Sequence, residues 1–340
     1  MMSEGAPTHY FLIAATVLDL LALTVGIGAL ICQLWLLPGT GVLDEADAHI
    51  LSTRIWQTIG ICIAALTLSS VIVLIVRTAE MSGYSLTDSF SILPQVMLVT
   101  HFGKVWMIRF VGLGLAWLGW FWGWRSLQSR AAWALILVAA ALIAASRSAS
   151  GHAADAGDFT LAETIDWLHI VMVSAWSGTL VVTSLVILPA IIQLANRRRL
   201  IITMVARRLS LMAGIGLAGV VVTGVFNAWR ELDGSFSALW NTAYGQLLSI
   251  KLLLVLAMIG LGAINRYRFL SLLQAWAGHP VKTQGLMHAL LSSQSSASAN
   301  KAPPTNNPAL AFTRTARIEV ILVFGVLLIT ALLVHTMPMH

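Results

Sequence analysis

The chain has 340 residues, of which 58% are hydrophobic and 10% are charged, whereas an ordinary soluble domain is about 45 to 50% apolar and about 25% charged. This composition excludes a soluble globular enzyme. Lys and Arg outnumber Asp and Glu by 20 to 14, an excess that indicates basic loops on one side of a membrane rather than nucleic-acid binding. The two cysteines, Cys32 and Cys62, lie in apolar runs, which excludes a disulfide framework and a Cys-based zinc site.

Long apolar runs dominate the sequence. A helix needs about 20 apolar residues to cross the hydrocarbon core, and eight runs meet or approach this length. A ninth, Phe90 to Thr100, is too short and contains Pro94, so we expect it at the interface or as a re-entrant piece buried against protein. We therefore predict an all-α polytopic membrane protein. Its eight spans begin near Tyr10, Ile55, Val105, Ala131, Ile165, Leu209, Gln246 and Ile318.

The basic residues predict the orientation, because Lys and Arg are retained on the cytoplasmic side. Most of them fall in the turn after the third span, the loop after the fifth span and the segment before the eighth. Both termini then lie outside. The inner segment 271–313 contains SSQSSASAN and KAPPTNNP, a mixture that cannot bury a core, and we expect a flexible cytoplasmic loop there.

One pair of segments indicates an internal repeat, VTHFGKVWMIRF at the third span and NTAYGQLLSIKL at the seventh. It predicts two parallel four-helix halves, 1–150 and 151–340, with the functional site between them. Alternatively, small, aromatic and basic residues mark the point where any helix enters a bilayer, and the aligned basic residues snorkel to the interface. The aligned pairs are Thr100 with Thr242, Gly103 with Gly245, and Arg109 with Lys251.

Metal-type side chains gather on the outer side. The chain ends in HTMPMH, which places His335, Met337, Met339 and His340 just beyond the eighth span. Thioether and imidazole groups together suit Cu(I) better than Mg, Ca or Mn. The alternative is a frayed tail whose methionines anchor it to the lipid surface. We predict copper binding, with the oxidation state left open.

A second group lies around the start of the fifth span. His152, Asp155 and Asp158 are in the preceding outer loop, and Asp166 and His169 are spaced i, i+3 on one helix face. His169 lies roughly 7 Å below the helix entry, and an ionisable residue at such depth is a functional candidate. Asp166 is either a ligand itself or orients the His169 ring by accepting its second N–H. Alternatively, the pair is a structural hydrogen bond.

Other polar residues in the apolar runs are weaker candidates. His101 and His9 lie at the outer level, where histidine is also an ordinary interfacial residue. Asp19 falls about a third of the way into the first span and requires an interior or wet environment. Cys32 and Cys62 are expected at similar depth in the inner leaflet, either as a soft exit site for Cu(I) or as packed core residues.

Motifs for other chemistry are absent from the sequence. It has no Walker-type phosphate loop, no C-x-x-C, no H-E-x-x-H and no phosphorylation motif of a cation pump. We therefore expect neither ATP-driven pumping nor an enzymatic activity.

Several segments together resemble the copper resistance protein D (CopD) family. They are GHAADAGD, DWLHIVMVSAWSGTLV, RRLSLMAGIGLAGVVVTG, LWNTAYGQLLSIK and the final TRTARIEVILVFG with its MPMH ending. The likeness covers the chain from Gly151 onward and extends more loosely into the first half through VTHFGKVWMIR.

The resemblance implies a bacterial inner-membrane protein with a periplasmic face that imports copper and works with a periplasmic carrier of the CopC type. With the orientation that the basic residues predict, both termini are then periplasmic. His152, Asp166 and His169 match the family's G-H-A and D-x-x-H pattern, so the resemblance implies a ligand role for them. The role of the C-terminal Met and His residues rests on ligand chemistry alone.

Three functions compete at this stage. A copper permease receives the metal at the outer His, Met and Asp site and passes it between the halves. A docking or sensing protein binds copper without moving it. A haem-binding electron-transfer protein requires paired axial histidines near both faces, and the clustering of histidines on the outer side disfavours it.

Overall fold

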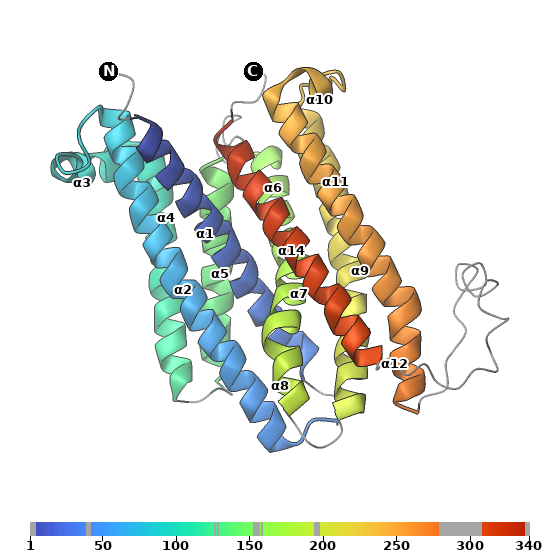
Figure 1. The fold of residues 1–340 in the computed structure, drawn as a ribbon. Coiled ribbons are helices and arrows are strands. Elements are labelled where there is room, and N and C mark those ends of the chain that lie inside the picture. The colour runs from blue at the N-terminus through green and yellow to red at the C-terminus, as the bar shows by residue number, and fades with distance from the viewer. Residues whose placement is uncertain are drawn as a thin grey trace.

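A computed structural model describes residues 5–38, 42–125, 127, 129–151, 157, 159–193, 198–278 and 308–336. Within these residues, eight helices are long and apolar enough to cross a membrane, which confirms the predicted all-α polytopic fold. Figure 1 shows them side by side in one bundle, with the N- and C-termini at the same end. We call this the termini end, and the opposite end the basic end.

The first half supplies four spans and one short helix. Its first span continues from an α-helix into a π-helical turn, and its longest helix begins with Asp44 as N-cap, whose side chain accepts from the Asp47 N–H at 2.7 Å. The elements are α1 (Gly5–Ile31), η1 (Cys32–Leu36), α2 (Glu45–Ser82), α3 (Ser89–Val99), α4 (His101–Trp124) and α5 (Arg130–Ala149).

The second half supplies the other four spans. Its first span runs through two π-helical turns, and its third continues past a further π-helical turn. The elements are α6 (Leu161–Val173), η3 (Ser174–Gly178), α7 (Thr179–Val182), η4 (Thr183–Ile187), α8 (Leu188–Gln193), α9 (Arg198–Glu231), α10 (Ala238–Asn241), α11 (Ala243–Ile264), η5 (Asn265–Phe269), α12 (Leu270–Trp276) and α14 (Pro308–Val334).

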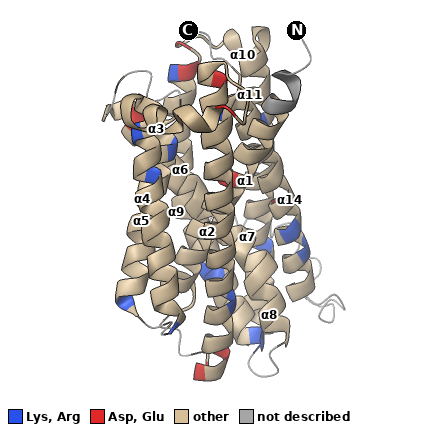
Figure 2. Cartoon of the chain, turned by 90° about the vertical axis from the view of Figure 1, so that its left-hand side faces the viewer, with Lys and Arg blue, Asp and Glu red and all other residues tan. Residues whose placement is uncertain are grey.

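Two segments test the finer predictions about chain organisation. Helix α3 lies across the termini end beside α2 and α4 (Figures 1 and 2), in agreement with an interfacial position for Phe90 to Thr100. The flexible loop predicted over 271–313 is too long, because α12 and α14 occupy its two ends. Leu273 and Phe312 explain the difference, since both are buried in the core and order these ends by packing. Residues 279–307 lie outside the described part.

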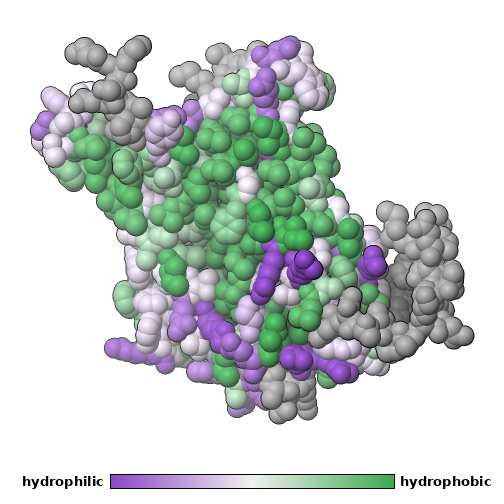
Figure 3. Space-filling view, viewed as in Figure 1, coloured by the Kyte–Doolittle hydropathy of each residue, from purple (hydrophilic) through white to green (hydrophobic). Residues whose placement is uncertain are grey.

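The surface has the pattern of a membrane protein. Figure 3 shows a broad apolar face over the middle of the helices, with hydrophilic residues gathered toward the basic end. Figure 2 shows Lys and Arg near that end of several helices. A belt of exposed apolar side chains is what a hydrocarbon environment stabilises. The bundle is therefore built to lie in lipid.

The repeat motif builds the same local structure twice. Thr100 caps α4 by accepting from the Gly103 N–H at 3.0 Å, and Thr242 caps α11 by accepting from the Gly245 N–H at 2.9 Å. Each glycine also lies against the preceding short helix, since a Cβ would lie 2.2 Å from the Val96 carbonyl oxygen or 2.1 Å from that of Ala238. This shared geometry supports a parallel repeat.

The first spans of the two halves cross at a pair of glycines. A Cβ on Gly28 of α1 would lie 2.0 Å from the carbonyl carbon of Gly178 in η3. In the opposite direction, a Cβ on Gly178 would lie 1.9 Å from the Thr24 carbonyl oxygen. The two backbones are thus in direct contact, and no space for an ion remains between them at this level.

Candidate functional site

The Asp166 and His169 side chains both face α9, as their i, i+3 spacing on α6 predicts. His169 Nδ1 lies 2.9 Å from Thr223 Oγ1, and Asn227 Nδ2 donates to Asp166 Oδ1 at 3.1 Å. Both side chains are only partly buried. The pair therefore forms a polar face between α6 and α9, and Asp166 also meets Ser148 and Arg147 at the end of α5 in the first half.

Among the described contacts, the His169 ring and the Asp166 carboxylate have separate hydrogen-bond partners. Thr223 is the hydrogen-bond partner of the ring, whereas Asp166 interacts with Asn227 and Ser148. One helical turn separates the two side chains along α6, and α9 presents a polar residue at each level. The imidazole is thus positioned by a hydroxyl, and the carboxylate remains a separate group.

A basic and an acidic residue complete the charges around this face. The Lys251 ammonium on α11 interacts electrostatically with Asp166 and Glu231, and also with His169. Glu231, at the end of α9, accepts a hydrogen bond from the Tyr244 hydroxyl. The termini end of the second half therefore brings together an imidazole, two carboxylates and an ammonium group.

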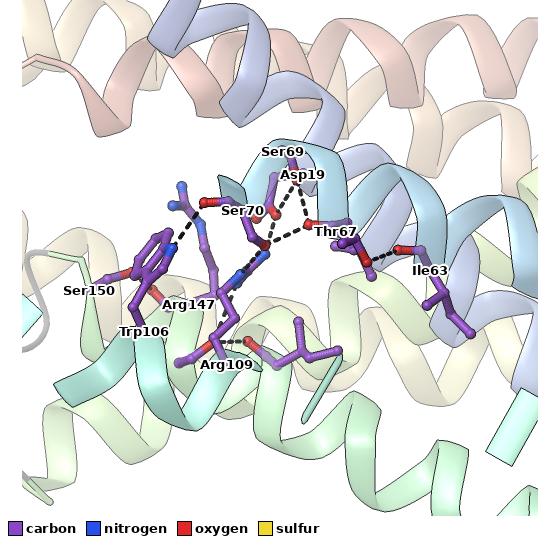
Figure 4. A network of polar contacts seen from close by, with 12 residues as sticks. Asp19, Ile63, Thr67, Ser69, Ser70, Trp106, Arg109, Arg147 and Ser150 are labelled. Carbon is purple, nitrogen blue, oxygen red and sulfur yellow. Dashed lines mark hydrogen bonds and ion pairs between the residues drawn. The ribbon is translucent and has the colours of Figure 1, made fainter. Parts of the chain in front are cut away.

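The first half holds a different polar network, drawn in Figure 4. Asp19 and Arg109 form an ion pair in which the side chains are 7% and 1% exposed. Arg109 Nε donates to Ser70 Oγ at 2.7 Å and Nη1 to Ser146 Oγ at 3.3 Å, while Ser69 donates to Asp19 at 3.0 Å. Arg109 is therefore not a snorkelling residue, and Asp19 has the interior position predicted for it.

The two networks occupy corresponding places in the repeat. Asp19 precedes the crossing residue Gly28 by the same number of positions as His169 precedes Gly178. Arg109 and Lys251 correspond through the repeat motif. The carboxylate of the first half is thus replaced by an imidazole in the second half, beside a basic residue in both.

His335 meets the beginning of the chain. Its Nε2 lies 3.0 Å from Thr16 Oγ1, and its ring centroid is 5.8 Å from that of His9. Burial is the main cause that lowers the pKa of His335 to about 4. His101 is elsewhere, with Nε2 3.2 Å from the Ala149 carbonyl oxygen.

The remaining predicted ligands lie outside the described residues. In the part of the chain that is described, no group of three or more His, Cys, Asp or Glu is arranged to hold a metal ion. The predicted cluster of thioethers and imidazoles is therefore not assembled from described side chains alone. The predicted ligands outside are His152, Met337, Met339 and His340, and Asp155 and Asp158 of the same outer loop also lie outside.

The two cysteines are both buried and free. Cys32 Sγ lies 3.9 Å from the Thr179 carbonyl oxygen and 3.9 Å from Thr183 Oγ1. Cys62 contacts the other side of α1, where a Cβ on Gly26 would lie 3.4 Å from it. These contacts favour a packing role, since each thiol fits a tight helix crossing.

Sequence reasoning missed two polar residues of the spans. Glu319 on α14 is 6% exposed and accepts from Asn265 Nδ2 at 2.6 Å. Arg147, in the last turn of α5, interacts electrostatically with both Asp19 and Asp166. The criterion that singled out Asp19, an ionisable residue in an apolar run, also applies to Glu319. The same criterion does not identify Arg147, because a basic residue in the last turn of a membrane helix is common.

Comparison with known families covers most of the chain. A model described as "Copper resistance protein D-like, N-terminal domain" matches residues 2–161, and one described as "Copper resistance protein D" matches residues 203–333. Asp166 and His169 lie between the two matched segments. No curated protein and no solved structure matches the chain significantly. With eight membrane-type helices and both family matches in order, the chain belongs to the copper resistance protein D family.

Proposed function

We propose that this protein is a copper permease that carries the metal inward across a bacterial inner membrane. The termini end faces the periplasm in this proposal, because the opposite end carries most of the basic residues that are retained in the cytoplasm. Family membership supports copper as the cargo. The protein acts by transport and not by catalysis.

One observation carries the proposal, the partly buried imidazole of His169 with the Asp166 carboxylate beside it on the same helix face. Polar groups at this depth are costly in lipid unless they serve a polar path or site. The route runs through the second half, since α1 and η3 are in backbone contact at Gly28 and Gly178.

The packing of α11 supports the same route. It packs mainly against α14, while α6 packs mainly against α9, and extensive contact of α11 with α6 or α9 is absent from the described residues. The side chains of Asp166 and His169 are therefore not sealed by a closed four-helix core. His169 supplies a nitrogen ligand and Asp166 an oxygen ligand for copper that enters from the termini end.

Two further elements belong to the proposal. A small periplasmic carrier of the CopC type delivers the copper, and His152, Met337, Met339 and His340 receive it near the membrane surface. These residues combine imidazole and thioether ligands that suit Cu(I). In this proposal, copper meets these residues before it reaches His169.

Copper uptake into sealed proteoliposomes tests the permease. We expect flux with the wild-type protein and a loss of at least tenfold with His169→Ala, because the ligand inside the membrane is removed. Thr223→Val retains the imidazole but removes its hydroxyl partner, and we expect a smaller loss. His49→Ala is the matched control, since this exposed histidine lies on α2 at the basic end.

Two outcomes contradict the proposal in different ways. Copper that binds to the wild type without entering the vesicles indicates a docking or sensing protein. Flux that persists unchanged in His169→Ala shows that copper takes a route that avoids this residue.

A further inference from the structure

Two histidines from opposite ends of the sequence lie next to each other at the termini end. His9 begins the first span and His335 directly follows α14, and their ring centroids are 5.8 Å apart at an interplanar angle of 79°. His9 is exposed and His335 is partly exposed. The rings are therefore accessible from the water side of the membrane, above the level of His169.

The surroundings of His335 are those of a metal-binding imidazole. A histidine ligand uses one ring nitrogen for the metal and donates the N–H of the other to an acceptor, which fixes its tautomer. His335 has two such partners, the Thr16 hydroxyl at 3.0 Å from Nε2 and the backbone of Leu12. One partner can hold the N–H while the other yields its place to a metal ion.

The separation of the rings fits a two-coordinate ion. A metal–imidazole bond is about 2.0 Å long, so two opposed bonds place the nitrogens about 4 Å apart and the ring centroids about 6 Å apart. The observed separation of the ring centroids is 5.8 Å, which matches this span. We propose that His9 and His335 together bind one Cu(I) ion as an entry site, which rests on the proposed copper transport.

The charges nearby select against divalent ions. Arg77 and Arg147 act electrostatically on His335, and Coulomb repulsion of a bound ion doubles when its charge doubles. Arg77 is partly compensated by Glu80, at 3.8 Å on the exposed side of α2. The site therefore favours Cu(I) over Cu(II) and Zn(II), although imidazole alone accepts all three.

Binding of Cu(I) to the purified full-length protein in detergent tests the site. A chromophoric Cu(I) chelator competes for the metal under reducing conditions, and the same titration is repeated with Zn(II). We expect His9→Ala and His335→Ala each to weaken Cu(I) binding at least tenfold. Thr16→Val is expected to weaken it less, because it alters the placement of His335 but leaves both ligands. His49→Ala, which removes an exposed histidine at the basic end, is the control and leaves the affinity unchanged.

Rescue separates ligation from folding. His9→Met keeps a soft ligand, so we expect this variant to retain the Cu(I) affinity of the wild type and to bind Zn(II) more weakly than the wild type does. A variant with Met337, Met339 and His340 all replaced by alanine identifies any binding by the tail. Unchanged Cu(I) affinity in both His9→Ala and His335→Ala overturns the proposal, as does complete loss of binding in the tail variant alone.

Transport assays distinguish this proposal from the permease. An entry site acts before the membrane step, so His9→Ala raises the half-saturating copper concentration and preserves the flux at saturation. If wild-type vesicles show no flux but binding still requires both histidines, the permease fails and the entry site stands as a copper-binding site. If flux is present and its dependence on copper concentration is the same in His9→Ala and His335→Ala as in the wild type, the proposed entry site is contradicted and the proposed permease is retained.

Discussion

The two halves share a scaffold but differ in how they treat their buried charges. In the first half, 39% of the apolar window of α4 is buried, whereas the figure for the span that begins with α11, its counterpart in the second half, is 11%. Asp19 and Arg109 of the first half are paired directly and surrounded by serine hydroxyls. Lys251, which corresponds to Arg109, has no ion pair within 4.0 Å among the described residues.

This difference indicates that the polar residues of the two halves have different roles. A guanidinium that saturates its carboxylate in a closed core leaves no ligand free for a metal ion. An imidazole held by one hydroxyl, with a carboxylate one turn away, still has ligand capacity. The buried charges of the first half therefore have a structural role. The corresponding side chains of the second half can still bind a metal ion.

The largest expected effect is on stability and concerns the first half. Arg109→Met leaves the Asp19 carboxylate buried without its partner, and losing one member of a buried pair typically costs about 3–5 kcal/mol. Lys251→Met at the corresponding position is expected to cost less than about 1 kcal/mol, because its partners are not in a closed pair. Denaturation in mixed detergent micelles measures both.

A double variant provides the control for this prediction. Asp19→Leu combined with Arg109→Met removes both charges, and we expect it to recover most of the lost stability. Equal losses in Arg109→Met and Lys251→Met contradict the contrast between the halves.

A smaller effect is expected where the halves meet. Gly178→Ala places a methyl group 1.9 Å from the Thr24 carbonyl oxygen, and backbone atoms cannot move aside as a side chain can. Overpacking of this kind typically costs about 1–3 kcal/mol. Gly114→Ala on α4 is the matched control, because a Cβ there meets open space and we expect a gain of about 0.5–1 kcal/mol from helix propensity. A thermal melt that ranks the two variants the other way contradicts the close crossing.

The fold followed from the sequence because the bilayer imposes one strong rule. Apolar runs of about 20 residues can satisfy their backbone in lipid only as helices, and all eight predicted runs are helices. The ends of the loop 271–313 were not predictable, since Leu273 and Phe312 are ordered by tertiary contacts that composition does not express. The two matching segments of the repeat motif were visible in the sequence because Thr100 and Thr242 cap their helices by the same local geometry.

The site was predictable only at the level of a single helix. The i, i+3 spacing placed Asp166 and His169 on one face, as observed, but it could not name Thr223 and Asn227 as their partners on α9. Hydrogen bonds between helices depend on rotation and depth, which the apolar pattern leaves open. The pairing of His9 with His335 is the extreme case, because it joins the two ends of the chain.

The smallest expected effect concerns the affinity of the second half for its ion. Lys251 acts on Asp166 and His169 as a built-in positive charge. At a distance on the order of 10 Å and an effective dielectric constant of about 20, a unit charge contributes about 1.7 kcal/mol. We therefore expect Lys251→Met to lower the copper concentration for half-maximal uptake, by roughly 20-fold at most. Lys104→Met, which removes an exposed charge of the first half, should leave it unchanged because solvent screens that charge. If both variants shift the half-maximal concentration equally, the cause is the surface potential of the protein. The specific electrostatic effect of Lys251 on Asp166 and His169 is then contradicted.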